Sequence, residues 1–235
     1  MDEGPRGWAA PLYGAVLDAT GVGAGTRVLD VGCGGGGFSR AAVARGAQVH
    51  GVDGDPSAVE RAAREVPEAT FAVGDATDLG EIGPVDVVGL VQVVAHLRDP
   101  RRALREAARV APGGVVAVSV WGREQDCDVR AFGEALAPWL GPRRPPPEDG
   151  PDLLADLVTD AGLEIAVSEQ VGCAFRYPDE DAVLGPLFDS GIGRHAMNTA
   201  GPAAVREAVL TRLEQHRDGA GYVLHNTFRV LTART

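Results

Sequence analysis

The 235-residue sequence predicts an α/β fold built on a doubly wound, largely parallel sheet. Through the first half of the chain, short runs rich in Val alternate with Ala/Arg/Glu segments whose apolar residues recur at helical spacing. Alternation of this kind is typical of βαβ units, in which each crossover helix returns the chain to a parallel strand. A glycine-rich turn directly after the first Val-rich run is a second indication of such a sheet.

Five strands and three helices are predicted in this half. The strands are expected at residues 26–31, 47–53, 69–74, 85–91 and 114–120, and the helices at residues 38–45, 56–66 and 100–110. Asp55 and Asp99 each precede a proline, so each is expected to be an N-cap followed by proline at the first helical position. Residues 111–114, Ala-Pro-Gly-Gly, are expected to end the third helix.

The second half of the chain is less regular. Residues 140–150 are rich in proline and polar residues, which indicates a surface connector. A helix at 151–161 and a strand at 163–175 are expected to follow. Residues 179–217 are mostly helical in pattern, with a break expected at the Gly-Ile-Gly of 191–193, and residues 222–232 alternate as a final strand does.

Composition excludes several classes of protein. The formal net charge is −11 and the chain contains no Lys, so no basic footprint for nucleic acid is present. No apolar run approaches the roughly 20 residues that span a bilayer, and the first residues lack the apolar region of a secretory signal. A soluble, cytoplasmic protein without a membrane partner, either a monomer or a homodimer, is therefore expected.

The three cysteines give little support for cross-links or metal. Cys33, Cys127 and Cys173 are widely spaced and form no CxxC pair. An odd number at this spacing predicts neither a disulfide framework nor a zinc site. We therefore expect no metal centre.

The glycine-rich turn is the most informative stretch. Gly32, Gly34 and Gly37 satisfy the GxGxxG pattern of a nucleotide-binding turn, a pattern that is weak evidence by itself. Asp30 lies two residues before the first glycine, where a carboxylate would repel a pyrophosphate but attract a cofactor that carries an ammonium group. Asp53 ends the second predicted strand, where it could accept hydrogen bonds from ribose hydroxyls in either class of site.

Four blocks in order and spacing resemble the class I S-adenosylmethionine-dependent methyltransferases. They read LDVGCGGGG at 29–37, GVDGDP at 51–56, GDATDL at 74–79 and VQVVAHLRDPRRALREAARVAPGGVVAVSVWG at 91–122. The resemblance implies a Rossmann-like, doubly wound sheet of seven strands with a C-terminal antiparallel strand and a helical lid insertion. It also implies an N-terminal helical lid segment at 1–25, a cofactor-binding core at 26–122, and lid helices and the last two strands at 123–235.

The resemblance further implies which residues bind S-adenosylmethionine and its product, S-adenosylhomocysteine. These are Asp30, Gly32, Cys33, Gly34, Asp53, Gly54, Asp75, Ala76 and Gln92. Asp30 matches the position that holds the cofactor's amino group, and the backbone at 32–34 would approach its methionine part. Asp53 would bind the ribose, with Gly54 leaving room beside the adenine. Asp75 and the Ala76 N–H would bind the adenine, and Gln92 would line the methionine end.

Each of these assignments has a structural alternative. Asp30 could cap a helix or lie in a solvated turn, and Asp75 could close the turn after its strand. Gln92 could be a polar residue at a strand end, and Cys33 a packing residue. The sequence leaves these alternatives open.

The reaction predicted is methyl transfer to a small molecule, such as a hydroxyl or amine of a secondary metabolite. His96, which follows the fourth predicted strand, is the first candidate for a catalytic base, with packing at a helix start as the alternative. His195, in the expected glycine-flanked break, is the second candidate, and His225 is expected to be structural. Aromatic residues at 8, 13, 121, 132, 139, 175, 177 and 188 are concentrated in three possible lid pieces and suit a flat or apolar acceptor.

Other functions remain open at this point. Related folds bind the same cofactor but catalyse cyclisation, rearrangement or decarboxylation, and the four blocks do not separate these from methyl transfer. An NAD(P)-dependent oxidoreductase is a second alternative, although the absence of Lys excludes its Tyr–Lys version. A module that binds the cofactor without turnover is a third.

Overall fold

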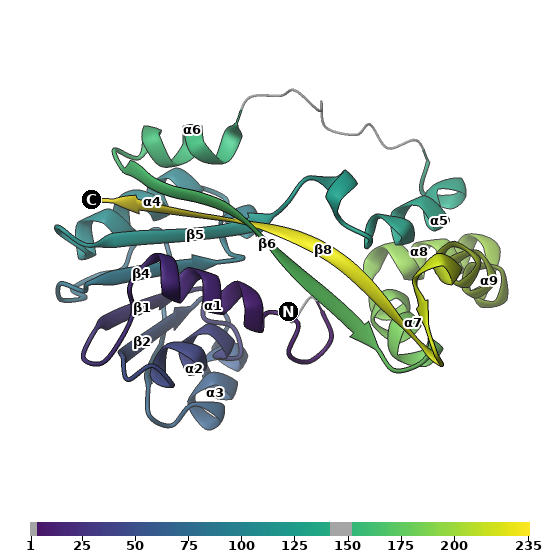
Figure 1. Ribbon diagram of the computed structural model, residues 1–235, viewed down its shortest axis with the longest axis horizontal. Helices are drawn as coiled ribbons and strands as arrows, with labels where there is room; N and C mark the ends of the chain where they lie inside the picture. Colours follow the sequence, from purple (N-terminus) through teal and green to yellow (C-terminus); the bar gives the residue numbers. More distant parts are fainter. Residues whose placement is uncertain (1–3, 142–151) are drawn as a thin grey trace.

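The computed structural model describes residues 4–141 and 152–235, which form an eight-stranded sheet flanked by helices (Figure 1). The strand order is β3-β2-β1-β4-β5-β8-β6. The parallel strands are β1 (Arg27–Val31), β2 (Gln48–Asp53), β3 (Thr70–Val73), β4 (Val87–Val91) and β5 (Val115–Trp121). Two long strands, β6 (Glu164–Tyr177) and β8 (Gly221–Arg234), are antiparallel to each other.

The predicted α/β fold is confirmed, with one strand more than expected. All five strands of the first half lie within two residues of their predicted ends. Strand β8 pairs antiparallel with β5, as the resemblance implies for the C-terminal strand. The additional strand is β7 (Arg217–Asp218), two residues that fold back on the start of β8. So short a strand leaves no period-2 pattern in the sequence.

Helices cover both faces of the sheet. Helices α1 (Ala10–Ala19) and α2 (Gly37–Val43) pack on one face, and α4 (Pro100–Val110) and α6 (Leu153–Asp160) pack on the other. Helix α3 (Pro56–Glu65) lies beside β2 and β3. The two faces follow from alternation along each strand. In β1, for example, Val28 belongs to the first core and Leu29 to the second.

Both predicted N-caps are present. The Asp55 Oδ1 atom accepts a hydrogen bond of 2.9 Å from the Ser57 N–H, and the Asp99 Oδ1 atom accepts one of 2.9 Å from the Arg102 N–H. These bonds satisfy amides of the first helical turn that have no partner within the helix. The starts of α3 and α4, each directly after a strand end, are thereby fixed by local chemistry.

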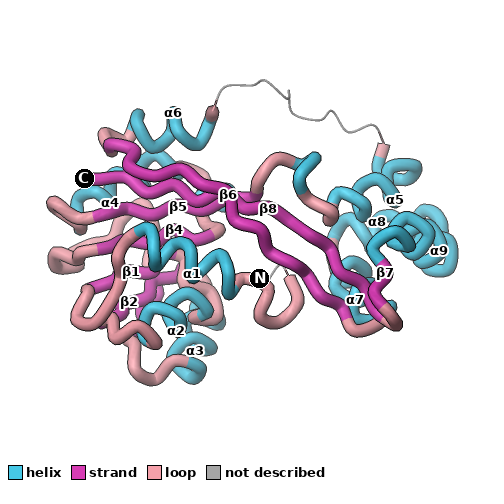
Figure 2. The backbone as a smooth tube through the Cα atoms, in the orientation of Figure 1, coloured by secondary structure: helices cyan, strands magenta, loops and turns pink. Residues whose placement is uncertain are grey.

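A two-stranded ribbon joins the core to a helical lid. In β8, residues 228–234 pair with β5, while residues 221–227 pair only with β6 and the short β7. Beyond this ribbon lie the four lid helices, as Figures 1 and 2 show. They are α5 (Arg130–Leu140), α7 (Glu180–Asp189), α8 (Gly191–Ala200) and α9 (Pro202–Leu213). Three short 3₁₀ helices, η1 (Val94–His96), η2 (Glu124–Asp126) and η3 (Glu214–His216), complete the described elements.

The break within the lid is not where the sequence predicts it. The expected interruption at residues 191–193 is wrong, because these residues form the first turn of α8. The chain breaks at Ser190 instead, whose hydroxyl accepts a hydrogen bond of 3.0 Å from the Gly193 N–H. Serine competes for backbone hydrogen bonds and so favours a cap over a helix interior. Of the predicted connector, residues 142–150 lie outside the described ranges, as does the first residue of the predicted helix at 151–161.

Four aromatic rings pack where the ribbon leaves the core, and we call them the aromatic joint. They are Trp8, Trp121, Phe175 and Phe228. The Phe228 ring centroid lies 4.9 Å from that of Trp8 and 4.5 Å from that of Trp121. The joint therefore connects the N-terminal segment, β5, β6 and β8.

Among the described residues, no helix combines the length and the apolar character that a membrane span requires.

Truncation of Phe228 is expected to destabilise the whole fold. Its side chain is fully buried, so Phe228→Ala should lower the free energy of unfolding by about 3–5 kcal/mol. Ile192→Ala is the control, because Ile192 is 50% exposed in the lid and should change stability by at most about 0.5 kcal/mol. Urea denaturation monitored by tryptophan fluorescence measures both, and a loss below 1 kcal/mol for Phe228→Ala would contradict the joint.

Candidate functional site

The predicted site residues lie at one edge of the sheet. Asp53 is the last residue of β2, while Gly32, Gly74 and Gln92 directly follow β1, β3 and β4. Because these four strands are parallel neighbours in the order β3-β2-β1-β4, their carboxyl ends share an edge. In open α/β sheets this edge is where ligands bind.

The glycine turn requires its glycines. Gly32 has a φ of +73°, and a Cβ atom on it would lie 2.5 Å from Cγ2 of Val93. Gly34 has a φ of +51°, a conformation that L side chains rarely adopt. The N–H groups of Gly32 and Cys33 both donate to the Val52 carbonyl, at 2.7 and 3.1 Å, which ties the turn to β2.

Asp30 is a buried carboxyl group within β1. Its side chain faces α2, where the Ser39 hydroxyl donates a hydrogen bond of 2.6 Å to Oδ2. Burial raises the pKa of Asp30 to about 6, the Ser39 hydrogen bond opposes the rise, and the charge of Asp53 adds to it. Asp30 is therefore not a solvated turn residue. Because the Ser39 N–H in the first turn of α2 also hydrogen-bonds to the carboxyl, the helix-capping alternative is compatible with the structure.

Asp53 bridges the two turns of the site. Its Oδ2 atom accepts a hydrogen bond of 2.8 Å from the Gly34 N–H, and its Oδ1 atom accepts one of 2.9 Å from the Asp55 N–H. A carboxylate oxygen can accept more than one hydrogen bond, so both oxygens keep capacity for a ligand. A Cβ atom on Gly54 would meet nothing closer than the Gly74 carbonyl at 3.8 Å, which leaves space beside Asp53.

Asp75 closes a turn. Its Oδ1 atom accepts hydrogen bonds of 2.8 Å from both the N–H and the hydroxyl of Thr77, and these bonds lower the pKa of Asp75. The turn-closing alternative from the sequence is thus present in the structure. It leaves Oδ2 without a hydrogen-bond partner among the described residues, and Ala76 lies half-buried beside it.

Gln92 is strained. Its φ of +61° makes it the single non-glycine residue with a positive φ in the described ranges. The buried Ser119 holds it there, because the Ser119 hydroxyl oxygen accepts from the Gln92 N–H at 3.1 Å and from Nε2 at 3.2 Å. A left-handed conformation costs a non-glycine residue about 1–2 kcal/mol, and such strain is common at functional sites.

Cys33 packs in the interior. Burial, with smaller effects from the charges of Asp30 and Asp53, raises the pKa of its thiol to about 12. The side chain is therefore an inert thiol near neutral pH. Any contact of Cys33 with a ligand would come from its backbone.

The candidate bases are spread over the structure. His96 is exposed in η1, just after β4. His195 lies exposed inside α8, so its predicted place in a glycine break is wrong. His225 is exposed on β8, where its backbone N–H donates to Asp128. His216, which sequence reasoning missed, lies 3.4 Å from the same carboxylate, and their separation of 88 positions in the sequence (216 − 128) leaves no local signal.

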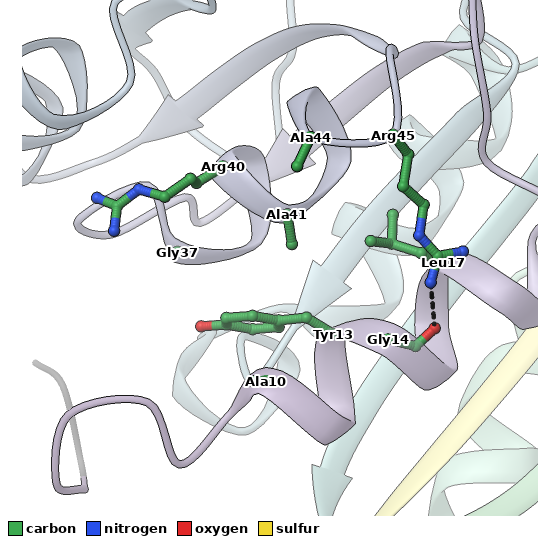
Figure 3. Close-up of a pocket in the computed structure, with 9 residues that line it drawn as sticks. All are labelled: Ala10, Tyr13, Gly14, Leu17, Gly37, Arg40, Ala41, Ala44 and Arg45. Carbon is green, nitrogen blue, oxygen red and sulfur yellow. Dashed lines mark hydrogen bonds between the residues drawn. The ribbon is translucent and has the colours of Figure 1, made fainter.

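An open cavity of about 460 Å³ lies between α1 and α2 (Figure 3). Its rim carries Arg40, whose guanidinium pairs with Glu65, and Arg45, which pairs with Asp18. Tyr13 projects along it, and a Cβ atom on Gly37 would lie 2.7 Å from the Tyr13 hydroxyl oxygen. The cavity thus borders the glycine turn at Gly37 but contains none of the predicted site residues.

Within the described ranges, no three His, Cys, Asp or Glu side chains gather as metal ligands.

The burial of Asp30 predicts that removal of its charge stabilises the fold, by an amount that depends on pH. The folded-state pKa of about 6 exceeds the ordinary aspartate pKa of 3.8, so the folded state binds more protons than the unfolded state between these pH values. Stability therefore falls as pH rises from about 4 to about 6, and Asp30→Asn should be about 2–3 kcal/mol more stable than wild type at pH 7.5.

Urea denaturation at pH 4 and pH 7.5 checks this gain, which should shrink at the lower pH. Asp86→Asn is the matched control. Because Arg27 lowers the pKa of Asp86, removal of the Asp86 charge should destabilise the fold at pH 7.5 rather than stabilise it. An Asp30→Asn variant that is less stable than wild type at pH 7.5 would contradict the assigned direction.

The strain at Gln92 predicts an unusual ranking of two variants. Both Gln92→Gly and Gln92→Ala lose the side-chain amide, but only glycine accepts the φ of +61° without strain. The Gly variant should therefore be more stable than the Ala variant by about 0.5–1 kcal/mol in urea denaturation. At the exposed strand residue Gln48 the order should be the opposite, since glycine is unfavourable in a strand. Equal stability of the two Gln92 variants would argue against strain.

Comparison with known proteins finds similarity over the part of the chain that carries these strand ends. A family model described as a methyltransferase domain matches residues 29–118. A 2-methyl-6-phytyl-1,4-hydroquinone methyltransferase of Synechocystis is 41% identical over 111 residues, which are 45% of this chain and 35% of that protein. A ubiquinone biosynthesis O-methyltransferase of Caulobacter is 36% identical over 106 residues, 42% of each chain. The chain thus spans about two fifths of the length of these curated relatives.

Among solved structures, the [4+2]-cyclase SpnF superimposes with a TM-score of 0.61 at 21% sequence identity, over 95% of this chain and 79% of that one. A likeness at this identity is one of fold alone. Residues 29–118 of this chain therefore resemble a methyltransferase domain, and they lie on the five parallel strands that carry the candidate site.

Proposed function

We propose that this chain transfers a methyl group from S-adenosylmethionine to a small-molecule acceptor. The observation that carries the proposal is Asp30, a carboxyl group buried at the glycine turn. Within the described part of the chain, the other charged group that acts on it is Asp53, which is also acidic. A buried carboxylate without a facing cation is costly, and a ligand with an ammonium group would supply the missing charge.

The remaining site residues fit the rest of this cofactor. Asp53 has capacity on both oxygens for the two ribose hydroxyls, and the open space at Gly54 would admit the adenine. The Oδ2 atom of Asp75, which has no hydrogen-bond partner among the described residues, would accept from the adenine amino group, and the Ala76 N–H would donate to the ring. The backbone of residues 32–34 would lie along the methionine part. Bound there, S-adenosylmethionine supplies a methyl group on a sulfonium, activated for in-line transfer.

The protein residues would align the acceptor and exclude water. We assign Gln92 to the methionine end, because it follows β4 and Ser119 fixes its amide. We assign His96 as the base that removes a proton from a hydroxyl acceptor. Its support is its position in η1, four residues after Gln92. An amine or an acidic phenol would need less help from a base.

A flat, aromatic acceptor with a hydroxyl or amine is the substrate class we favour. The curated relatives include proteins named as hydroquinone and ubiquinone-biosynthesis methyltransferases. The half-buried Trp8 and Trp121 of the aromatic joint lie where β5 ends, near this edge of the sheet. The net charge of −11 favours a small acceptor over a nucleic acid.

We also propose a division of labour along the chain. Residues 1–25 would act as an N-terminal lid segment and residues 26–122 as the cofactor-binding core. Residues 123–235 would provide the substrate lid and the last strands of the same domain. Support comes from α1, which packs on α2 and on the ribbon strands, and from the four lid helices beyond the ribbon.

Isothermal titration with S-adenosylmethionine, S-adenosylhomocysteine and NAD tests the proposal. The first two should bind at micromolar concentration and NAD should not. Binding of NAD alone would overturn the cofactor assignment. Formation of S-adenosylhomocysteine with a panel of phenolic and amine acceptors would then separate methyl transfer from a reaction that leaves the cofactor intact.

Removal of the Asp53 carboxylate should weaken cofactor binding at least about tenfold, a loss of about 1.4 kcal/mol. Asp53→Ala removes both ribose acceptors and the anchor of the Gly34 N–H. Asp86→Ala is the matched control, since it removes the same charge at the opposite end of the parallel strands, where Asp86 pairs with Arg27. Calorimetry with S-adenosylhomocysteine measures both variants, and an unchanged affinity of Asp53→Ala would exclude the ribose assignment.

A further inference from the structure

The contact between Asp30 and Ser39 joins the first turn of α2 to β1. Ser39 is the third residue of α2, and its hydroxyl donates to Oδ2 of Asp30 at 2.6 Å. Both side chains are buried, with exposed fractions of 0% and 2%. A length of 2.6 Å falls in the range of charge-assisted O–H···O⁻ bonds.

The groups that face Asp30 are few. From α2, Ser39 contributes its hydroxyl and its backbone N–H, both of which favour the ionised carboxyl. From β2, Asp53 contributes a negative charge, which opposes ionisation. From the glycine turn, Cys33 contributes a thiol that stays protonated. Ser39 is therefore the principal side chain on the described residues that stabilises the charge of Asp30.

We propose that Ser39 is a positioning residue that keeps Asp30 ionised and oriented for the ammonium group of the cofactor, which makes capture of the cofactor's amino-acid end dependent on pH. This proposal rests on the proposed function, because it takes Asp30 as the ligand of that ammonium group. Ser39 is not among the residues to which we assign cofactor binding. Its contact with Asp30 makes that binding dependent on pH.

The physical basis is linkage between a proton and the cofactor. Only the ionised form of Asp30 attracts an ammonium group, so the apparent affinity scales with the ionised fraction. With a pKa of about 6, wild type should bind an ammonium-bearing ligand roughly fourfold more weakly at pH 5.5 than at pH 7.5. Without the Ser39 hydroxyl the pKa of Asp30 rises further, so the affinity for the ligand should begin to fall at a higher pH as the solution is acidified.

The test compares two ligands that differ in this one group. S-adenosylhomocysteine carries the amino-acid end, whereas 5′-methylthioadenosine keeps the adenosine and lacks it. Calorimetry of wild type, Ser39→Ala and Ser39→Thr is carried out with each ligand at pH 5.5, 6.5 and 7.5, all above the isoelectric point of about 4.9. Ser39→Thr keeps the hydroxyl and is the conservative control.

The affinity of Ser39→Ala for S-adenosylhomocysteine should fall at least about tenfold between pH 7.5 and pH 5.5, while the affinities of wild type and Ser39→Thr should fall roughly fourfold. For 5′-methylthioadenosine, all three proteins should bind alike at every pH. An unshifted pH profile in Ser39→Ala would overturn the role of Ser39. Equal weakening of both ligands would also overturn it, because it would assign Ser39 to the fold. Failure of wild type to bind either ligand would instead overturn the proposed function itself.

Discussion

The pairing of β8 with β5 is the interaction on which the rest of this structure depends. Residues 228–234 of β8 lie between β5 and the edge strand β6, and residues 221–227 extend beyond β5 with β6 toward the lid helices. Because β8 runs antiparallel to β5, it reaches the lid at the same edge where the parallel strands end. One continuous strand thus connects the sheet that carries the candidate site to the lid helices, and Phe228 of the aromatic joint lies where this strand leaves β5.

The candidate site is the part of the fold that works against stability. Asp30 is a buried acid that folding must take out of water, and Gln92 is held in a left-handed backbone conformation. In each case one buried serine compensates in part, Ser39 for the charge and Ser119 for the strain. Two serines thus support two unfavourable residues at neighbouring strand ends, at the edge of the sheet where we propose that the cofactor binds.

Features set by neighbouring residues could be predicted from the sequence, and features set by tertiary contact could not. The Asp55 and Asp99 caps depend on amides two or three residues away, so their pattern is local and both are present. The order of the first five strands follows from hydrophobic runs and the resemblance. Ser39 and Ser119 were missed because a serine on a buried helix face or strand gives no sign of its partner. Gly191 and Gly193 predict a break at 191–193 because glycine is unfavourable inside a helix, but the Ser190 side chain caps α8, so the break lies at Ser190 and both glycines are helical.

The hydrogen bond from Gly34 to Asp53 favours our proposal that this glycine turn binds an ammonium group and a ribose rather than a phosphate. In a turn that binds pyrophosphate, backbone N–H groups near the helix start are free to donate to the ligand. Here the Gly34 N–H already donates to Oδ2 of Asp53 at 2.8 Å, and the carboxyl of Asp30 lies buried in the preceding strand. A phosphate would have to displace one carboxylate and approach the other. An ammonium group and a ribose would leave both in place, because each adds a donor to an oxygen that can still accept.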